Sequence, residues 1–235
     1  MKPDNSLWVD DLDSSFKVFH ELMAHKIHEI LLVLSPYDAF IMEEDTSLYT
    51  RIINEYRGLN LSRPPRLTSV STGDDALNLV RHKKFDLVIT LPQIGEMDCD
   101  TLGCKIKKIC PLLPVILLAH SLKAISPYLE KDPLCGIDNF YIWSADPALL
   151  LGLIKNIEDH RNVEKDTSLA MVRVLILVED SPLYKSFFLP LLYTEGVAQT
   201  QAVMHESLNE EHKLLKMRAR PKILVAENYE KAMQL

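Results

Sequence analysis

Short apolar runs alternate with amphipathic segments along most of this chain. Each run has the length of a β-strand and is apolar at consecutive positions, as from Ile30 to Leu34, which is typical of strands buried on both faces of a parallel sheet. The segments between them place apolar residues three and four positions apart, as helices packed on such a sheet do. The pattern predicts strands at 30–34, 66–71, 85–90, 114–119 and 136–143, and helices at 14–26, 36–56, 74–82, 98–109, 121–130 and 147–163.

This order of elements predicts an α/β fold of three layers, αβα, with helices on both faces of a five-stranded parallel sheet. Five strand–helix units within about 135 residues is the size of a flavodoxin-like domain. The expected strand order is therefore 2-1-3-4-5, with right-handed crossovers.

Composition excludes several classes of protein. The 235 residues include only 7 glycines, and neither G-x-G-x-x-G nor G-x-x-x-x-G-K-[ST] occurs, so a glycine-rich phosphate loop is excluded. The longest purely apolar runs are about five residues, far short of the roughly 20 that a membrane helix needs. The net charge of −7 gives no reason to expect nucleic-acid binding.

Cysteine and histidine spacing gives no metal site. The amino-terminal segment lacks the layout of a secretory signal peptide, so we expect a cytoplasmic protein whose four cysteines stay reduced. Cys99, Cys104 and Cys110 fit no C-x-x-C pattern and are expected as buried or half-buried thiols. His20 and His25 lie one position too far apart for H-E-x-x-H, so no zinc site is predicted.

A basic cluster at 213–222 is attributed to the end of a helix, where cations are favourable.

Three segments carry a family resemblance. Residues 85–98 read FDLVITLPQIGEMD, residues 111–119 read PLLPVILLA and residues 136–144 read GIDNFYIWS. They resemble the third, fourth and fifth strands of a response-regulator receiver (CheY-like) domain, which read like F-D-L-V-I-x-D, P-x-x-P-V-I-x-L-T-A and G-A-x-D-Y-L-x-K-P. The resemblance covers about residues 28 to 165. It implies the flavodoxin-like fold and a role in phosphorelay signal transduction in a two-component system.

The resemblance also identifies the positions where receiver chemistry would lie. In that family two acids after the first strand and one after the third hold Mg²⁺, and the third acid accepts the phosphoryl group. A Thr or Ser and a Lys offset the charge of the phosphoryl oxygens. In this chain the five positions hold other residues: Leu34, Ser35, Leu91, Ala119 and Trp143. The resemblance therefore implies a degenerate pseudo-receiver without a phosphoryl or metal site, in which Leu91 and Trp143 make the former site apolar and available as a contact surface.

Two other acids lie near the replaced positions in sequence. Neither Asp38 nor Asp98 directly follows a predicted strand. We therefore expect Asp38 to begin a helix and Asp98 to belong to a turn.

A second receiver-like segment follows the first. Residues 172–182, VRVLILVEDSP, resemble a receiver's first strand, with Glu179 and Asp180 as its acidic pair. Residues 221–232, PKILVAENYEKA, resemble its second strand and the start of its second helix. Segments that would match the third to fifth strands do not follow within the 235 residues. We therefore expect an incomplete unit whose vestigial acidic pair binds no metal, and Mg²⁺ would bind only if the unit were completed.

The segment between these two pieces, 183–219, predicts a long helix that Pro190 kinks or restarts. An apolar stripe along it predicts homodimer formation or packing on the first unit: Phe187, Leu191, Ala198, His205, Leu208, His212 and Leu215. The expected organisation is a helical segment at 1–27, a receiver-like domain at 28–165 and an incomplete second unit at 172–235.

Four further segments, 35–45, 58–62, 161–164 and 217–222, resemble the N-terminal regulatory region of bacterial phosphoenolpyruvate-synthase-like or pyruvate phosphate dikinase-like proteins. This resemblance implies an ATP-binding and phosphotransfer domain elsewhere in the parent protein. Nothing in the 235 residues carries that chemistry, so this chain itself is not expected to be an enzyme.

The leading hypothesis is a non-catalytic regulatory module that acts through protein contacts and as a homodimer, with neither nucleic acid nor membrane as a partner. The alternative is a true phosphorelay receiver, phosphorylated through a completed second unit that contains Glu179 and Asp180. A third hypothesis, a flavodoxin-like ligand-binding domain, lacks the phosphate loop that it would need.

Overall fold

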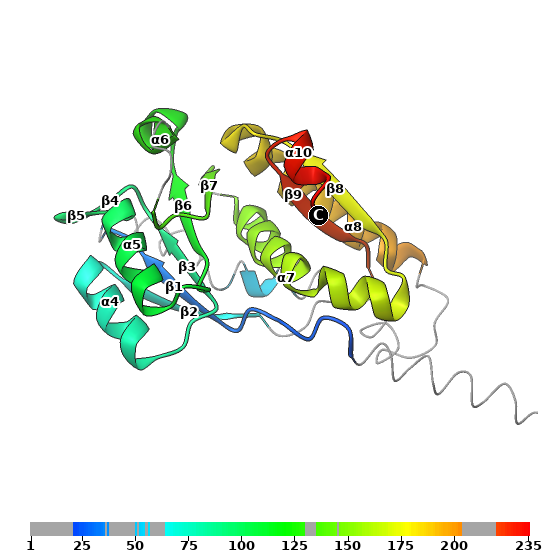
Figure 1. The fold of residues 1–235 in the computed structure, drawn as a ribbon, viewed down its shortest axis with the longest axis horizontal. Helices are drawn as coiled ribbons and strands as arrows, with labels where there is room; N and C mark the ends of the chain where they lie inside the picture. Colours follow the sequence, from blue (N-terminus) through cyan, green and yellow to red (C-terminus); the bar gives the residue numbers. More distant parts are fainter. Residues whose placement is uncertain are drawn as a thin grey trace, which may run out of the picture.

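A five-stranded parallel sheet forms the centre of the first unit. The computed structural model describes residues 21–35, 37, 50, 52–54, 56, 64–129, 135–144, 146–203 and 220–235. The strands of this sheet are β1 (Glu29–Val33), β2 (Arg66–Val70), β3 (Leu87–Thr90), β6 (Val115–Ala119) and β7 (Asn139–Ile142). Their order is β2-β1-β3-β6-β7, which confirms the predicted flavodoxin-like order (Figure 1).

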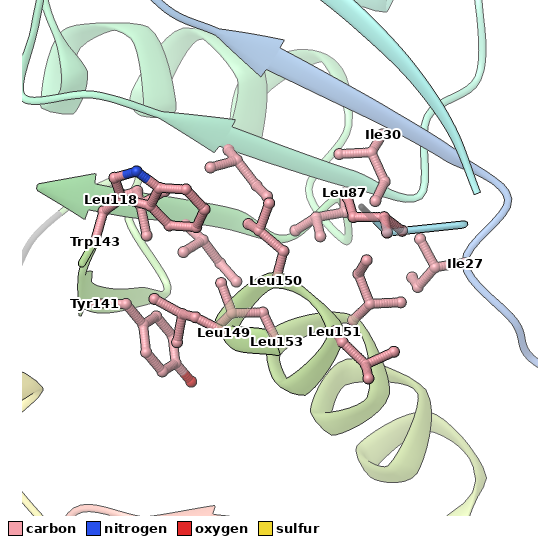
Figure 2. Packing of buried hydrophobic residues seen from close by; sticks show 14 of the residues in the cluster. Ile27, Ile30, Leu87, Leu118, Tyr141, Trp143, Leu149, Leu150, Leu151 and Leu153 are labelled. Atoms are coloured by element: carbon pink, nitrogen blue, oxygen red, sulfur yellow. The ribbon is translucent and has the colours of Figure 1, made fainter. Parts of the chain in front are cut away.

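Two hydrophobic clusters cover the two faces of this sheet. One contains Leu31 and Val33 of β1 and packs under α4 (Gly73–His82), α5 (Cys99–Ile109) and α6 (Leu122–Leu129). The other contains Ile30 and Leu32 and packs under α7 (Pro147–Ala170), as Figure 2 shows. Successive side chains of a strand point to opposite faces, so the uninterrupted apolar run of β1 serves both clusters.

Helix starts follow local capping chemistry. The side chain of Thr72 accepts a hydrogen bond from the backbone N–H of Asp75 at the start of α4, and that of Asp98 accepts one from Thr101 at the start of α5. Each cap satisfies one of the amides that a helix leaves without an internal partner. Asp98 is thus the N-cap of α5, next to the turn in which it was expected, whereas Asp38 and the expected helix at 36–56 lie largely outside the described residues.

A small hairpin precedes α5. Strand β4 (Gln93–Ile94) pairs antiparallel with β5 (Met97–Asp98). Gly95, in the turn between them, has φ +59°, which glycine adopts without a steric penalty. The apolar pattern did not predict this hairpin, because two-residue strands are too short to show an alternation.

Two predicted helix boundaries are wrong. Residues 24–28 were expected to include the end of a helix but have no regular structure, and most of the predicted segment 14–26 lies outside the described residues. Helix α7 was expected to end at 163 but continues to Ala170, where Met171 caps it in the left-handed conformation. Both differences have one cause: the backbone amides of Met23, His25 and Ile27 bind polar side chains of α7 instead of continuing a helix.

The second unit is a β–α–β segment that packs on α7. Strand β8 (Val174–Val178) pairs in parallel with β9 (Lys222–Ala226), α8 (Pro182–Val203) lies between them in sequence, and α10 (Tyr229–Ala232) follows. Figure 1 shows α7 between the five-stranded sheet and this second unit. Because α7 is enclosed from both sides, 13 of its residues are buried.

Helix α8 differs from its prediction in the face that it buries. It runs through Pro190 from Pro182 to Val203 without restarting, and residues 204–219 lie outside the described part. Its buried positions are Leu189, Tyr193 and Val197, whereas Phe187 and Leu191 of the predicted stripe are exposed. Within α8 the predicted stripe therefore does not pack on the first unit, because the helix contacts α7 and β7 through a different face.

The four cysteines do not all remain thiols. Cys104 of α5 and Cys135 form a disulfide, with Cα atoms 5.3 Å apart, whereas Cys99 and Cys110 are free. The expectation of four reduced cysteines is therefore wrong for one pair. These two residues are 31 positions apart in sequence, and only the packing of α5 against the segment before β7 brings them together.

Among the residues that the structure describes, no helix is both long enough and apolar enough to cross a membrane.

Candidate functional site

The carboxyl edge of the five-stranded sheet is where receiver chemistry would lie, and here it is apolar. Leu34, Leu91 and Trp143 directly follow β1, β3 and β7, and Ala119 ends β6. These four residues are 3%, 4%, 8% and 0% exposed, respectively. Ser35 follows Leu34 and is only partly buried. The structure therefore brings the replaced positions to the same edge.

Backbone hydrogen bonds hold these residues in the sheet. The N–H of Leu34 donates to the carbonyl of Val70 at 3.0 Å, and the N–H of Trp143 donates to that of Ala119 at 2.7 Å. Figure 2 shows the Trp143 indole beside Leu118 and over the start of α7. Leu34, Leu91 and Trp143 belong to the same hydrophobic cluster as Leu118.

This packing decides what the edge can do. Mg²⁺ is coordinated by oxygen atoms, chiefly of carboxylates and water, and the side chains of Leu34, Leu91 and Trp143 supply none. Within the described ranges, no group of three or more His, Cys, Asp or Glu side chains could hold a metal ion. The prediction that Leu91 and Trp143 form a contact surface is wrong, because both side chains are buried in the core.

A hollow lies beside this edge, between the start of α4 and the β4–β5 hairpin. Its volume is about 810 Å³, and it is lined by 72–74, 93–98, Thr101 and Lys105. Asp74, Glu96 and Asp98 make much of its lining acidic. None of the five replaced receiver positions lines it.

The acidic pair of the second unit lies at the carboxyl end of β8. Asp180 is exposed, and Glu179 is half-buried and accepts a hydrogen bond from the N–H of Ser181 at 2.9 Å. After the neighbouring strand β9, the carboxylate of Glu227 pairs with Lys231. The hydrogen bond from Lys231 lowers the pKa of Glu227 and outweighs burial, which would raise it.

Lys185 of α8 is a buried cation between the two units. Its Nζ donates to Oδ1 of Asn139 at 3.0 Å and lies 4.8 Å from the centre of the Tyr141 ring. The side chain is 2% exposed, and burial lowers its pKa to about 8 in spite of the attraction of Glu227. Neither the hydrophobic pattern nor the family resemblance indicated this lysine, because a polar residue between apolar helix positions resembles a solvated one.

The lowered pKa of Lys185 predicts stability that increases with pH. Below pH 8 both folded and unfolded states hold the proton, and the folded state carries the full cost of the buried charge. Between about 8 and about 10.4 the unfolded chain is protonated and the folded chain is not, so the folded state gains stability. We expect the free energy of unfolding in urea to rise by about 1.5 kcal/mol from about pH 7.5 to about pH 9.5.

The Lys185→Met variant should flatten this rise, whereas Lys165→Met, which changes an exposed lysine of α7, should retain it. An unchanged slope in the Lys185→Met variant would show that another group causes the dependence.

A buried ionic network holds three segments together along α7. Asp159 is fully buried and accepts hydrogen bonds from both Nη atoms of Arg220 at 2.9 and 2.8 Å, from the Tyr193 hydroxyl at 2.8 Å and from the N–H of Ile223 at 2.9 Å. One carboxylate thus joins α7, α8 and the start of β9. Burial raises the pKa of Tyr193 well above its usual value, and the neighbouring Asp159 adds to this.

The same face of α7 holds the segment that leads into β1. Asp166 accepts hydrogen bonds from the N–H of Met23 and lies 2.6 Å from the Nζ of Lys222. Asn162 and Glu158 accept from the N–H groups of His25 and Ile27. The sequence did not predict this network, because charged residues at helical spacing are usually solvated. Only the structure shows that three carboxylates of α7, those of Glu158, Asp159 and Asp166, are 0–1% exposed.

The solved structures to which the chain is similar include several receiver domains. The signal receiver domain of an HD domain-containing protein from Pseudomonas fluorescens Pf-5 is 24% identical, with 61% of this chain and 95% of that one covered and a TM-score of 0.44. A CheY-like receiver domain protein from Methanospirillum hungatei JF-1 is 21% identical, with 59% and 99% covered and a TM-score of 0.44. The receiver domain of sensor histidine kinase PA1611 from Pseudomonas aeruginosa PAO1, with a magnesium ion coordinated in its active site cleft, is 19% identical, with 56% and 97% covered and a TM-score of 0.42.

No model of a protein family and no curated protein matches this chain. The strand order β2-β1-β3-β6-β7 establishes the fold without reference to these matches.

Proposed function

We propose that this chain is a regulatory receiver-like module that transmits signals through protein contacts and does not accept a phosphoryl group in its first unit. The observation that carries the proposal is the apolar carboxyl edge of the sheet. Leu91 stands where a carboxylate would accept the phosphoryl group, and it is 4% exposed. Transfer to a carboxylate accumulates negative charge that a metal ion and a cation must offset, and the buried side chains at this edge offer neither.

Two experiments test the missing site. Incubation with Mg²⁺ and acetyl phosphate, followed by intact-mass measurement, should give no acid-labile adduct on any aspartate. The chain has two tryptophans, Trp8 and Trp143, and Trp143 lies at this edge. In a Trp8→Phe variant the tryptophan fluorescence therefore reports on the edge alone. Its emission should be unchanged by Mg²⁺ up to about 10 mM, a level ample for a weak oxygen site.

The receiver domain of PA1611, whose structure contains magnesium, is the positive control for metal binding. A stoichiometric adduct in the first unit would overturn the proposal, and the position of any adduct would discriminate between the alternatives. An adduct between 28 and 165 would mean that the first unit is active. An adduct between 172 and 235 would favour a phosphorelay role for the second unit, whose Asp180 is exposed at the end of β8.

The proposed partner is an ATP-binding and phosphotransfer domain of a phosphoenolpyruvate-synthase-like protein. We propose that this module regulates that domain as a homodimer and that both lie in the cytoplasm. The support for this part is the sequence resemblance of the four segments described above. Reading the gene beyond the codon for Leu235 tests it directly, because such a domain would be encoded in the same frame.

A further inference from the structure

Strand β8 has the composition of a central strand but the position of an edge strand. In β1 the apolar residues 30–33 are between 0% and 5% exposed, because β1 lies between β2 and β3. In β8 Val174, Ile176 and Val178 are 40%, 41% and 49% exposed, and within the described part of the chain this strand pairs with β9 alone. An exposed apolar edge strand is a site for pairing with another strand.

The backbone groups at the open edge can be identified from the pairing with β9. The carbonyl of Arg173 accepts from the N–H of Lys222 at 2.8 Å, and the N–H of Glu179 donates to the carbonyl of Ala226 at 2.9 Å. Along a parallel strand the N–H and C=O of one residue point to the same side, and successive residues alternate. The backbone N–H and C=O groups of the odd-numbered residues 173–179 therefore point to β9. Those of Val174, Ile176 and Val178 point to the open edge.

The sequence of β8 is self-complementary. Residues 173–179 read RVLILVE, an apolar palindrome centred on Ile176 with a cation at one end and an anion at the other. If two copies pair antiparallel about Ile176, Val174 of each lies opposite Val178 of the other, and all the open-edge groups of these residues are satisfied. Arg173 of each copy then lies opposite Glu179 of the other, in the type of pair whose side chains approach most closely.

Helix α8 of the same unit also carries an exposed apolar face. Tyr184, Phe187 and Leu191 are 56%, 62% and 47% exposed, and the rings of Phe187 and Phe188 pack edge to face. Figure 1 shows α8 behind the β8–β9 sheet. A two-fold axis perpendicular to the sheet would place both copies of α8 on the same face. Their apolar side chains would add to the area of two short strands, which alone is small for a stable interface.

We propose that the open edge of β8 binds a second copy of this chain, so that β9-β8-β8-β9 forms one continuous sheet across a two-fold axis. The proposal rests on the homodimer of the proposed function and assigns it a surface. It is independent of the missing phosphoryl site. A dimer that does not respond to changes in β8 would leave the proposed function intact and overturn this assignment alone.

Charge reversal tests the register. The dimer dissociation constant, measured by sedimentation equilibrium, should rise about tenfold or more in Arg173→Glu and in Glu179→Arg, since each variant places like charges opposite one another at both ends of the strand pair. The double variant restores opposite charges and should return to within about threefold of the wild type. Lys165→Glu, which reverses an exposed charge on α7, should leave the constant unchanged.

A wild-type chain that is monomeric at about 100 μM would overturn the proposal, because specific dimers of this kind form at far lower concentrations. A double variant as weak as the single variants would also overturn it, since the paired charges would then not face one another.

Cross-linking tests the two-fold axis. Only Ile176 lies opposite its own copy, with Cα atoms about 5.5 Å apart, which is within disulfide range. Ile176→Cys should therefore form a covalent dimer under mild oxidation, whereas Val174→Cys should not, because its own copy would be about 13 Å away along the strand. Mixing Val174→Cys with Val178→Cys should restore cross-linking. Equal yields from Ile176→Cys and Val174→Cys would show that the strands do not pair about Ile176.

Discussion

Replacing Asp159 by Ala is expected to lower the free energy of unfolding by about 4 kcal/mol. The carboxylate is fully buried and accepts hydrogen bonds from Arg220, Tyr193 and Ile223. Its removal leaves the Arg220 guanidinium, which is 4% exposed, as a buried charge that has lost a bidentate partner. Removing one member of a buried ion pair costs more than the pair contributes, because the remaining charge stays desolvated.

Urea unfolding at neutral pH measures this change. Glu164→Ala is the matched control, since it removes an exposed carboxylate from the same helix and should change stability by no more than about 0.5 kcal/mol. The Asp159→Leu/Arg220→Met double variant should recover part of the loss, because no unpaired charge then remains buried.

A local readout accompanies the global one. Asp159 joins α7 to α8 and β9, so its loss should loosen residues 172–235 before the five-stranded sheet unfolds. Limited proteolysis of Asp159→Ala should therefore cut between α7 and β8 at a protease level that leaves Glu164→Ala intact. Equal stability and equal cleavage of the two variants would show that the network does not hold the second unit in place.

The second large effect is expected at Gly136. A Cβ at this position would lie 2.1 Å from the backbone N of Cys104 and 2.1 Å from the carbonyl carbon of Gly103. These atoms belong to the backbone of α5, which can move aside only if the helix shifts. Gly136→Ala should therefore lower the free energy of unfolding by about 3 kcal/mol. The measurement is made with a reducing agent present, so that the Cys104–Cys135 disulfide does not mask the change.

Two other glycines provide graded controls for the same substitution. Gly196 lies within α8 with open space around its Cα, so Gly196→Ala should stabilise the protein by about 0.5–1 kcal/mol through helix propensity. Gly95 also has open space but a φ of +59°, so Gly95→Ala should cost about 1–2 kcal/mol from backbone conformation alone. If Gly136→Ala were no worse than Gly95→Ala, α5 and the segment before β7 would not be in the close contact described above.

The central sheet was predictable because its signal is local and repeated. Strand β6 is apolar at every position, β1 at all but Glu29 and β3 at all but Thr90, and such runs occur where a strand is covered on both faces. The strand order then follows from the alternation with helices and from the handedness of the crossovers. The replaced receiver positions were predictable for the same reason, since Leu34 and Trp143 end predicted strands and Leu91 directly follows one.

Long-range contacts account for the errors. The extension of α7 to Ala170 and the irregular backbone at 24–28 arise together, because Asp166 and Asn162 bind amides more than a hundred positions away. The apolar stripe did not identify the face of α8 that packs on the first unit, because α7 and β7 select Leu189 and Tyr193 over Phe187. The Cys104–Cys135 pair depends on the close approach at Gly103 and Gly136, which no local spacing reveals.

By itself the sequence determined the five-stranded parallel sheet, the positions at its carboxyl edge and their apolar character. Each of these depends on residue type and short-range periodicity. Only the tertiary structure decided that Leu91 and Trp143 fill the core instead of forming a surface, that Asp159 holds Arg220 in the interior, and that β8 keeps an open edge. The burial of a side chain and the pairing of a strand edge depend on neighbours supplied by distant segments, and periodicity along the chain does not encode which segments meet.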